Sequence, residues 1–475
     1  MVTGKVKFIG IDISTTAVSG VGYTDKGEII SASVPMRGAT TWRNQPAHTL
    51  YALTKNPLDE GMLYEIISLL EQQSNGLSPD GAICFSVRQH DMVLTDDEFH
   101  LLAPALSWQC NWANQEVKEL KENGIENDVG MIEPRFILPK LLKTIREDIE
   151  DRDGPNITYF LSHVMTTGDW VNLMLTGRAA LSTSDALSNG LLYQKNKRLA
   201  IRVIRAAGLS PIWFPPVVQS GTIVGRVRES EDPAWEKLCK KLHSWLVIAG
   251  LGDNHAGAVG CGLSDFGTIV VSAGSSGTAV RLAFNNAQTF GEAVSFEFFN
   301  YRMLLTMLAD CATRYDQFVR KYGENKTHKE LDELVESISG SQFASKIINV
   351  QKAIKNGKSE EEAVAELSLS EKITYIQYDI TKKLGDIVYI LADEVLYQKY
   401  NLKKIVLTGG LTKSGFFCKC LAEYLCFLNL PVYKLVGIAS SKAAAYGALI
   451  TAMVGSGYFP NLKAATKTMC MLKPV

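Results

Sequence analysis

Short apolar runs alternate along the chain with longer amphipathic stretches, a pattern typical of strands interleaved with helices. An apolar run over 7–13, a Ser/Thr turn and a second apolar run over 18–23 predict a strand hairpin near the start. A similar arrangement recurs at 266–282, where two apolar runs enclose a turn of glycine and hydroxyl residues. Because both halves of the chain contain this arrangement, we infer an internal duplication within an α/β fold.

The remaining pattern predicts further helices and strands between and after these hairpins. The helices are expected at 66–73, 108–120, 139–149 and 373–397, and the strands at 80–87, 245–249 and 404–408. A length of 475 residues is more than one domain usually holds. We expect an N-terminal domain over 1–246 and a C-terminal domain over 247–475, with the charged stretch 324–369 as a solvated helical insertion.

Composition and charge narrow the class of protein. The net charge is −1 and the pI is about 6.7, so no basic excess favours a nucleic acid or an anionic membrane as partner. The least charged long stretch, 436–455, contains Lys442 and is expected to form a core helix rather than a membrane span. The first ten residues lack a long apolar run, and the nine cysteines suit reduced thiols, so we expect a cytoplasmic protein.

Asp253 is the first candidate for chemistry. It follows the apolar run 245–249 and a turn expected at 250–252, and it precedes small residues that can continue as a helix. A carboxylate at the mouth of a strand–turn–helix is well placed to take a proton from a bound alcohol. An aspartate at such a position can also simply cap the helix, and this fragment alone leaves both interpretations open.

Two turns are candidates for binding phosphate. The first follows Asp12 and offers the hydroxyl groups of Ser14, Thr15 and Thr16, which suit a phosphate, while Asp12 could hold Mg²⁺ through water. The alternative is an ordinary hairpin with a buried, hydrogen-bonded aspartate. The second turn, with Gly274, Ser275, Ser276 and Thr278, could hold a polyphosphate from the other side.

Two other polar or glycine-rich segments follow predicted strands. Four polar residues come directly after the strand at 80–87, where α/β sheets tend to bind ligands, and they suit a polyhydroxylated one: Arg88, Gln89, His90 and Asp91. Gly409 and Gly410 follow the strand at 404–408, and glycines let a backbone approach a flat ligand closely. A simple strand-to-helix turn is the alternative for the latter.

The order of these four segments resembles that of the FGGY carbohydrate kinases, which are related to actin, the heat-shock ATPases and hexokinase. The segments are Asp12 to Thr16, Gly252 to Gly262, Ser272 to Thr278 and Thr408 to Ser414. The sequence of residues 252–260 is most similar to that of xylulokinases. The resemblance implies two ribonuclease-H-like (actin-like ATPase) domains, with ATP, Mg²⁺ and a sugar in the cleft between them.

The resemblance also implies roles for individual residues. Asp253 matches the catalytic base and Asp12 the acid that positions Mg²⁺. The positions that match sugar-binding residues are Arg88, Gln89, His90, Asp253 and Asn254. The positions that match ATP-binding residues are Ser14, Thr15, Thr16, Gly274, Ser275, Ser276, Thr278, Gly409, Gly410, Lys413 and Ser414.

This chain departs from the family pattern mainly in the sugar segment. Cys110 and Trp112 stand where the family's Trp-x-Asp-x-Arg motif has its acid and its arginine. Ser14 replaces a glycine in the first turn, and Lys442 stands where a glutamate is common. Polar partners in a sugar site discriminate strongly between substrates, so these departures concern the choice of sugar.

We therefore expect an ATP-dependent kinase of a ketose or polyol, with a xylulose-like sugar favoured. Its partner is a small molecule rather than a nucleic acid or a membrane, and the resemblance allows a homodimer. The alternative is a sugar- or nucleotide-binding sensor that has lost turnover. A heat-shock type chaperone would need a further peptide-binding domain, for which the chain leaves little room after its last predicted core helix at 440–453.

Overall fold

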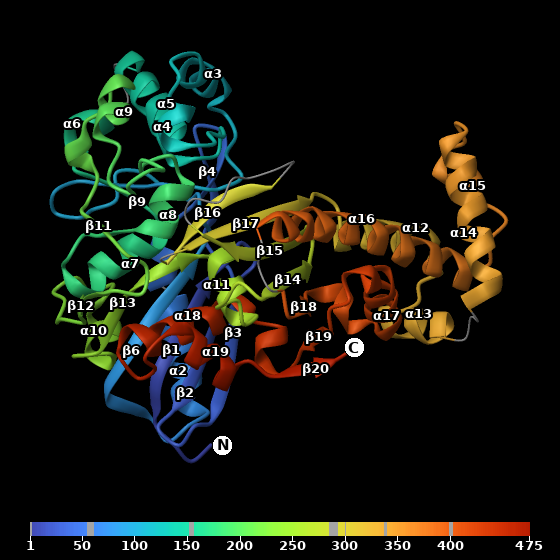
Figure 1. Cartoon of the computed structure of the whole chain (residues 1–475). Helices are drawn as coiled ribbons and strands as arrows, with labels where there is room; N and C mark the ends of the chain where they lie inside the picture. The colour runs from blue at the N-terminus through green and yellow to red at the C-terminus, as the bar shows by residue number, and fades with distance from the viewer. Residues whose placement is uncertain are drawn as a thin grey trace. The chain divides into compact units, whose positions relative to one another are not determined.

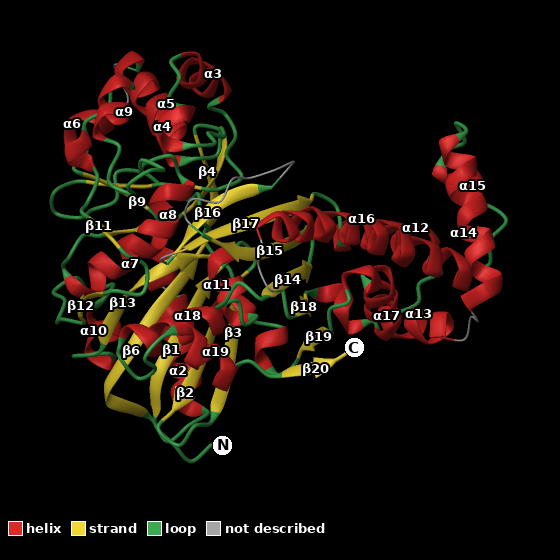
Figure 2. Ribbon diagram, in the orientation of Figure 1, coloured by secondary structure: helices red, strands yellow, loops and turns green. Residues whose placement is uncertain are grey.

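The computed structural model describes residues 2–54, 61–151, 156–284, 293–299, 301–336, 340–398 and 402–475. It is an α/β chain whose internal contacts group into two compact units (Figures 1 and 2). The first unit comprises 1–262, 296–301 and 442–470, and the second comprises 263–295, 302–441 and 471–475.

The first unit is built on a six-stranded sheet in the order β12-β13-β6-β1-β2-β3. The central strand β1 pairs antiparallel with β2 and parallel with β6, and β13 lies parallel to β6 on its other side. The strands are β1 (Val6–Ile13), β2 (Ala17–Thr24), β3 (Ile29–Pro35), β6 (Leu77–Val87), β12 (Ile223–Arg226) and β13 (Leu246–Gly252).

A second, seven-stranded sheet has the order β16-β17-β15-β14-β18-β19-β20, and it lies in the second unit except for residues 296–298 of β16 and 301 of β17, which group with the first. Here β14 pairs antiparallel with β15 and parallel with β18, as β1 does with β2 and β6, so the predicted repetition of the hairpin is present in the structure. The strands are β14 (Thr268–Ala273), β15 (Gly277–Ala283), β16 (Val294–Phe298), β17 (Tyr301–Leu308), β18 (Lys404–Thr408), β19 (Val432–Leu435) and β20 (Leu472–Pro474).

Helices from both ends of the chain cover the first sheet. α2 (Met62–Gln72) packs on β2 and β3, and α18 (Ala443–Gly455) packs on β1, on β6 and against α11 (Asp253–Gly260) (Figure 1). The two helices approach so closely that a Cβ atom at Gly447 would lie 1.8 Å from the carbonyl oxygen of Ala256. A glycine is therefore required at this crossing.

The first unit contains further helices and several small strands. Its helices are α1 (Tyr51–Thr54), α3 (Asn114–Glu122), α4 (Glu126–Val129), α5 (Ile137–Glu150), α6 (Ile157–Phe160), α7 (Thr167–Thr176), α8 (Thr183–Ser188), α9 (Ile201–Ala206), α10 (Glu236–Lys241) and α19 (Leu462–Met469). Its small strands are β4 (Ala39–Trp42), β5 (Gln45–His48), β7 (Val93–Thr95), β8 (Ala105–Leu106), β9 (His163–Met165), β10 (Leu181–Ser182) and β11 (Val217–Val218).

In the second unit, α12 and α13 pack against the long helix α16, which in turn contacts α17. The predicted insertion 324–369 contains helices joined by turns, and residues 337–339 lie outside the described residues. It is not solvated throughout, because Leu331, Val335 and Val364 are buried in the core of the second unit. The helices are α12 (Ala312–Tyr322), α13 (His328–Glu336), α14 (Gly340–Lys355), α15 (Glu360–Val364), α16 (Leu369–Gln398) and α17 (Gly415–Tyr424).

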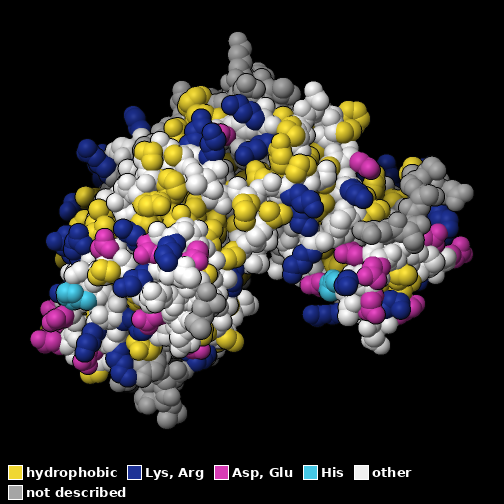
Figure 3. All heavy atoms as spheres, turned by 90° about the horizontal axis from the view of Figure 1, so that it is seen from below, with side chains coloured by type: hydrophobic (Ala, Val, Ile, Leu, Met, Phe, Trp, Pro, Cys, Tyr) yellow, Lys and Arg dark blue, Asp and Glu magenta, His cyan; other side chains and the backbone are white. Residues whose placement is uncertain are grey.

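The compact units and the predicted domains divide the chain at different points. Three segments of the predicted C-terminal domain group with the first unit: 247–262, 296–301 and 442–470. Within the described residues, no helix has the length and apolar character needed to span a membrane. On the face shown in Figure 3, Lys and Arg side chains are interspersed with Asp and Glu side chains, in keeping with a net charge near zero.

Candidate active site

The carboxyl ends of β1, β6 and β13 bring the predicted acids of the first unit together. Asp12 of β1 is in register with Ser86 of β6, and Ser86 is in register with Leu251 of β13, two residues before Asp253. Residues 250–252, predicted as a turn, continue the strand β13 instead. The N-cap of α11 is Gly252, so Asp253 is not the capping residue of this helix.

Both acids are partly buried, and the loss of hydration raises their pKa values because it disfavours the charged form. The pKa of Asp12 rises to about 7, although Ser86 Oγ donates a hydrogen bond of 2.8 Å to its Oδ1 and opposes the rise. The pKa of Asp253 rises to about 6, and the charge of Asp91 adds to the effect of burial. The negative charge of Asp253 also raises the pKa of Asp12, whereas Lys442 lowers it.

In the first predicted phosphate turn, the Ser14 side chain is hydrogen-bonded within the turn. Ser14 Oγ donates to the carbonyl oxygen of Ala17 over 2.8 Å, and Thr15 Oγ1 accepts from Trp108 Nε1 over 3.0 Å. Ser14 is not among the residues with positive φ, so a side chain is tolerated where the family has glycine. The backbone carbonyl of Ser14 accepts from Arg88 Nη1 over 3.2 Å, and Thr16 is exposed.

Arg88 forms a buried ion pair at the end of β6. Its Nε lies 2.6 Å from Asp91 Oδ2, and both side chains are almost fully enclosed. Asp91 also accepts hydrogen bonds from the backbone N–H of Trp108 over 3.0 Å and from Thr167 Oγ1 over 3.3 Å. Buried charges persist only when they are paired and hydrogen-bonded in this way, so the pair fixes the sugar segment to β6.

This arrangement corrects the prediction for the segment around Trp108. Residues 108–112 do not open a helix, because the N–H of Trp108 is bonded to Asp91 and α3 begins only at Asn114. Cys110 is fully buried, and Trp112 packs near Trp42 with ring centroids 6.5 Å apart. The two departures from the family motif are therefore placed in the packed interior of this segment.

Gln89 links the end of β6 to the start of α11. Its Oε1 accepts from Asn254 Nδ2 over 3.2 Å, and its Nε2 lies 2.8 Å from His255 Nδ1 and 3.1 Å from Ser188 Oγ. Because these contacts involve the residues directly after Asp253, they hold the position of the α11 terminus. The structure thus links Gln89 by hydrogen bonds to Asn254 and His255, the two residues that follow Asp253 in the chain.

His90 is held as a neutral side chain. Its ring stacks on Phe136 at 4.7 Å, and its Nδ1 lies 3.1 Å from Asn189 Oδ1. Asn189 Nδ2 donates to the carbonyls of Gln89 and Asp185, so Oδ1 is the acceptor and His90 Nδ1 carries the proton. Burial and the nearby cation of Arg135 lower the pKa of His90 to about 3, which leaves Nε2 as a hydrogen-bond acceptor.

The second unit brings the predicted ATP-binding residues to one edge of its sheet. Ser272 of β14 is in register with Thr408 of β18 and with Thr278 of β15. Gly409 has a φ of 100°, and a Cβ there would lie 2.5 Å from the carbonyl carbon of Ala273, so only glycine fits. Gly410 faces open space, since a Cβ there would meet no atom within 4 Å.

The remaining residues of this edge differ in exposure. Ser275 and Ser276 are exposed in the turn between β14 and β15, and the N–H groups of Cys311 and Ala312 donate to the carbonyls of Ser275 and Gly274. Lys413 is exposed. Ser414 is buried as the N-cap of α17, where its Oγ accepts from Phe417 N over 3.2 Å.

Several residues that shape the site carried no recognisable sequence signal. Lys140 Nζ contacts the carbonyl oxygen of His90 and lies 3.3 Å from that of Ser107. Asn189 is hydrogen-bonded to both Gln89 and His90, which precede it by about one hundred residues in the sequence. Asp91, in contrast, belongs to the polar cluster that the sequence pattern identifies after the strand at 80–87. No group of three or more His, Cys, Asp or Glu in the described residues could hold a metal ion by itself.

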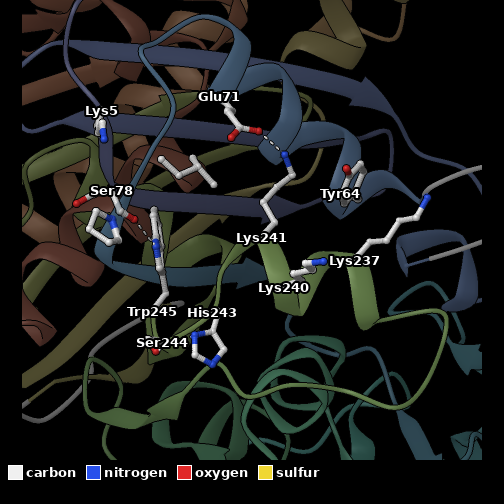
Figure 4. A pocket seen from close by; sticks show the side chains of 12 residues that line it. Lys5, Tyr64, Glu71, Ser78, Lys237, Lys240, Lys241, His243, Ser244 and Trp245 are labelled. Atoms are coloured by element: carbon white, nitrogen blue, oxygen red, sulfur yellow. Dashed lines mark hydrogen bonds and ion pairs between the residues drawn. The ribbon is translucent and has the colours of Figure 1, made fainter.

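A separate hollow of about 1000 Å³ lies at the opposite ends of β1 and β6 (Figure 4). Lys5, which precedes β1, and Leu77 and Ser78, which begin β6, contribute to its lining. Lys241 crosses it to reach Glu71, and Trp245 Nε1 donates to the Ser78 carbonyl over 2.9 Å. The predicted site residues do not line it, because they lie at the carboxyl ends of the same strands.

Comparison with known proteins gives one family and one fold. Residues 7–260 match the N-terminal domain of the FGGY family of carbohydrate kinases. The xylulose kinase of Escherichia coli (strain K12) is 26% identical over 57% of this chain, and this chain spans only about half, 53%, of the length of that relative. The xylulose kinase of Bacillus subtilis (strain 168) is 23% identical over 96% of this chain and 89% of its own length.

A solved structure has the same fold at low sequence identity. The crystal structure of a xyloylose kinase from Brucella ovis superposes with a TM-score of 0.77, at 18% identity, over 98% of this chain and 94% of that one. The predicted α/β fold class, with ribonuclease-H-like (actin-like ATPase) domains, is confirmed by this likeness. The resemblance that the four motifs indicated is confirmed as well: the chain belongs to the FGGY family of carbohydrate kinases.

Proposed function

We propose that the chain is an ATP-dependent kinase that transfers the γ-phosphate of ATP to a hydroxyl group of a ketose or polyol, with a xylulose-like sugar as the starting candidate. The observation that carries the proposal is the position of Asp253 at the end of β13. Its carboxylate has a raised pKa and stands directly before Asn254, which is bonded to Gln89. Asp253, the polar residues proposed to bind the sugar and the second acid, Asp12, thus follow or end neighbouring strands of the same sheet.

Asp253 is the proposed general base. A carboxylate whose pKa is about 6 is ionised at neutral pH and accepts a proton more readily than an ordinary aspartate. It would take the hydroxyl proton as the sugar oxygen forms a bond to the γ-phosphorus. The bond from that phosphorus to the oxygen it shares with the β-phosphate breaks, and ADP leaves with the electron pair.

The neighbouring polar groups would orient the sugar. His90 Nε2 is an acceptor and suits a sugar hydroxyl that donates. Asn254 and Gln89 offer amide groups in the same network, and Arg88 supports them through its ion pair with Asp91. Holding the hydroxyl near Asp253 in a fixed orientation supplies much of the rate enhancement expected of a phosphoryl transfer.

The donor set around Asp12 fits Mg²⁺. The negative charge of Asp253 raises the pKa of Asp12, so a cation bound here would favour the ionised carboxylate, and Mg²⁺ commonly binds through one or two carboxylates and its own waters. When bound, Mg²⁺ would neutralise charge on the phosphates of ATP. Asp12 would hold it, and the hydroxyls and N–H groups of Thr15 and Thr16 would contact phosphate oxygens.

The residues proposed to bind the nucleotide in the second unit offer groups for both its phosphates and its adenosine. Ser275, Ser276 and Thr278 offer hydroxyl groups for phosphate, and Lys413 offers an exposed cation near the end of β18. The open space at Gly410 suits the flat face of adenosine. Ser414 caps α17, so its part in ATP binding would be to fix the Gly409–Lys413 segment.

The sensor interpretation rests on the altered Trp108–Trp112 segment, yet a binding protein needs neither Asp12 nor Asp253 in particular. We therefore favour the kinase. The proposed partner is a small-molecule sugar or polyol and the proposed compartment is the cytoplasm, which the cysteine content suits. A homodimer stays a prediction.

The test is ADP release with Mg·ATP across pentuloses, hexuloses, polyols and sugar acids, for the native chain and for Asp253→Asn. We expect sugar-dependent ADP formation that falls about 10²–10⁴-fold in the variant, the usual contribution of a general base. Asp97→Asn, an exposed aspartate of the same unit, is the matched control and should keep full activity. ATP binding without turnover on any acceptor would instead support the sensor.

A further inference from the structure

Arg135 is a cation beside His90 for which the described residues provide no anionic partner. It directly precedes Phe136, whose ring stacks on His90 at 4.7 Å, and its charge acts on the His90 ring. Among the described residues no hydrogen bond or ion pair is made by its guanidinium group, and its Nε is buried without a partner. An enclosed guanidinium nitrogen without an acceptor is costly, so its partner should come from outside the chain.

A second cation, Lys140, also lies beside His90. Its buried Nζ contacts only carbonyl oxygens, those of His90, Leu106 and Ser107, rather than a carboxylate. Cys110, which is close enough to Lys140 to affect its titration, is a buried neutral thiol. The carboxylate that also acts on Lys140 is Asp91, and Asp91 is already paired with Arg88.

The acidic residues of the proposed site are not paired with Arg135 or Lys140. Asp12 and Asp253 stand at the strand ends where the phosphate is proposed to be transferred, and Asp91 is neutralised by Arg88. The charged groups that act on His90 are Arg135 and Lys140, with His255 as a further basic group. The part of the sugar site around His90 is therefore positive, and a wholly neutral sugar would leave Arg135 without a counter-charge.

We propose that the substrate carries a carboxylate, as an aldonate (a linear polyhydroxy acid) does, and that Arg135 binds this carboxylate beside His90. The proposal rests on the proposed kinase function and names its substrate class. The planar guanidinium matches a carboxylate in a paired, two-point contact, which a hydroxyl group cannot offer. Neutral His90 would donate nothing from Nε2, so it would accept from a hydroxyl next to the carboxylate.

The test compares matched acceptors and matched variants. Steady-state kcat/KM is measured with xylonate and gluconate against xylulose and xylitol, for the native chain, Arg135→Gln, Arg135→Lys and the exposed control Arg202→Gln. We expect the native chain to prefer an aldonate by at least about 10-fold, on the scale of a charge-assisted hydrogen bond. Arg135→Gln should lower that preference about 10- to 100-fold through KM, Arg135→Lys should restore part of it, and Arg202→Gln should change nothing.

Two outcomes would overturn the proposal. The first is a higher kcat/KM of the native chain for the neutral sugars than for the aldonates. The second is that Arg135→Gln lowers kcat/KM equally for acid and neutral acceptors while its melting temperature is unchanged. Calorimetric binding of gluconate without ATP separates this proposal from the kinase function. If no acceptor is phosphorylated but gluconate binds and Arg135→Gln abolishes binding, the kinase function fails and the carboxylate site stands. If gluconate does not bind and neutral sugars are phosphorylated, the kinase stands and the carboxylate site fails.

Discussion

Trp108 donates its indole N–H to the hydroxyl oxygen of Thr15 over 3.0 Å, which joins the predicted sugar segment to the predicted phosphate turn. The same tryptophan is fixed at its backbone N–H by Asp91, the partner of Arg88. A single residue thus connects the buried ion pair of the sugar site to a hydroxyl group proposed to contact phosphate. Changes at Trp108 should therefore affect both substrates.

Replacing Trp108 by Phe should lower kcat/KM about 3- to 10-fold, because it removes a hydrogen bond worth about 0.5–1.5 kcal/mol and leaves the Thr15 hydroxyl without its donor. Steady-state kinetics at varied ATP and varied sugar measure the change. Trp112→Phe is the control, since Trp112 packs near Trp42 and makes no described contact with Thr15. An equal effect of both variants would show that segment packing, not the Thr15 contact, is responsible.

The pH dependence of turnover should report Asp253. Burial raises its pKa to about 6, and a general base acts only when deprotonated, so kcat/KM should fall about tenfold per pH unit below about 6 and level off above about 7. Saturating Mg²⁺ keeps the proposed ligand Asp12 ionised, so that Asp12 does not contribute to this limb. An ascending limb near pH 4, the range of an ordinary aspartate, would contradict the enclosure of Asp253.

The two neighbouring glycines after β18 should respond differently to alanine. Gly409→Ala should destabilise the protein by about 1–3 kcal/mol, because φ is 100° and the new Cβ would lie 2.5 Å from the Ala273 carbonyl carbon. Gly410→Ala meets no atom within 4 Å, so stability should change by less than about 0.5 kcal/mol. Its methyl group would enter the proposed adenosine space and raise the KM for ATP. Thermal unfolding and ATP kinetics of both variants give this comparison, and a normal KM in Gly410→Ala would exclude that placement.

The strands and the acids at their ends could be predicted because the signal is local. Apolar runs on either side of turns with serine and threonine predicted the strands β1, β2, β14 and β15. Parallel pairing brings the carboxyl ends of β1, β6 and β13 to one edge of the sheet. That rule places Asp12 and Asp253 at the same edge of the sheet, whereas their proposed roles came from the family resemblance.

The surroundings of these acids depend on contacts between distant segments and leave no periodic pattern. Lys140 reaches a carbonyl 50 residues away, and Asn189 reaches one 100 residues away. The helix expected from Trp108 onward fails for the same reason, since its first N–H is taken by a carboxylate 17 residues earlier in the chain. Such tertiary hydrogen bonds override local preference wherever a buried charge must be satisfied.

Lys140 provides the strictest test of these surroundings. Lys140→Met keeps the length of the side chain but removes the donor to buried carbonyls of His90 and Ser107, so stability should fall by about 2–4 kcal/mol. Burial lowers the pKa of Lys140 from its ordinary value to about 8, so the unfolded chain binds its proton more tightly than the folded one. Stability of the native chain relative to Lys140→Met should therefore increase as pH rises from about 8 to about 10.

Urea unfolding of the native chain, Lys140→Met and Lys140→Arg at pH 7.5 and 9.5 measures both effects. Lys140→Arg retains donors but is larger and does not titrate in this range, so it should recover part of the stability at pH 7.5 and show no growing difference from Lys140→Met at pH 9.5. A stability difference between the native chain and Lys140→Met that is constant with pH would mean that the amine is better hydrated than its enclosure by carbonyls indicates. In that case the positive charge beside His90 would be screened by water, and Arg135 alone would define the anion-binding part of the sugar site.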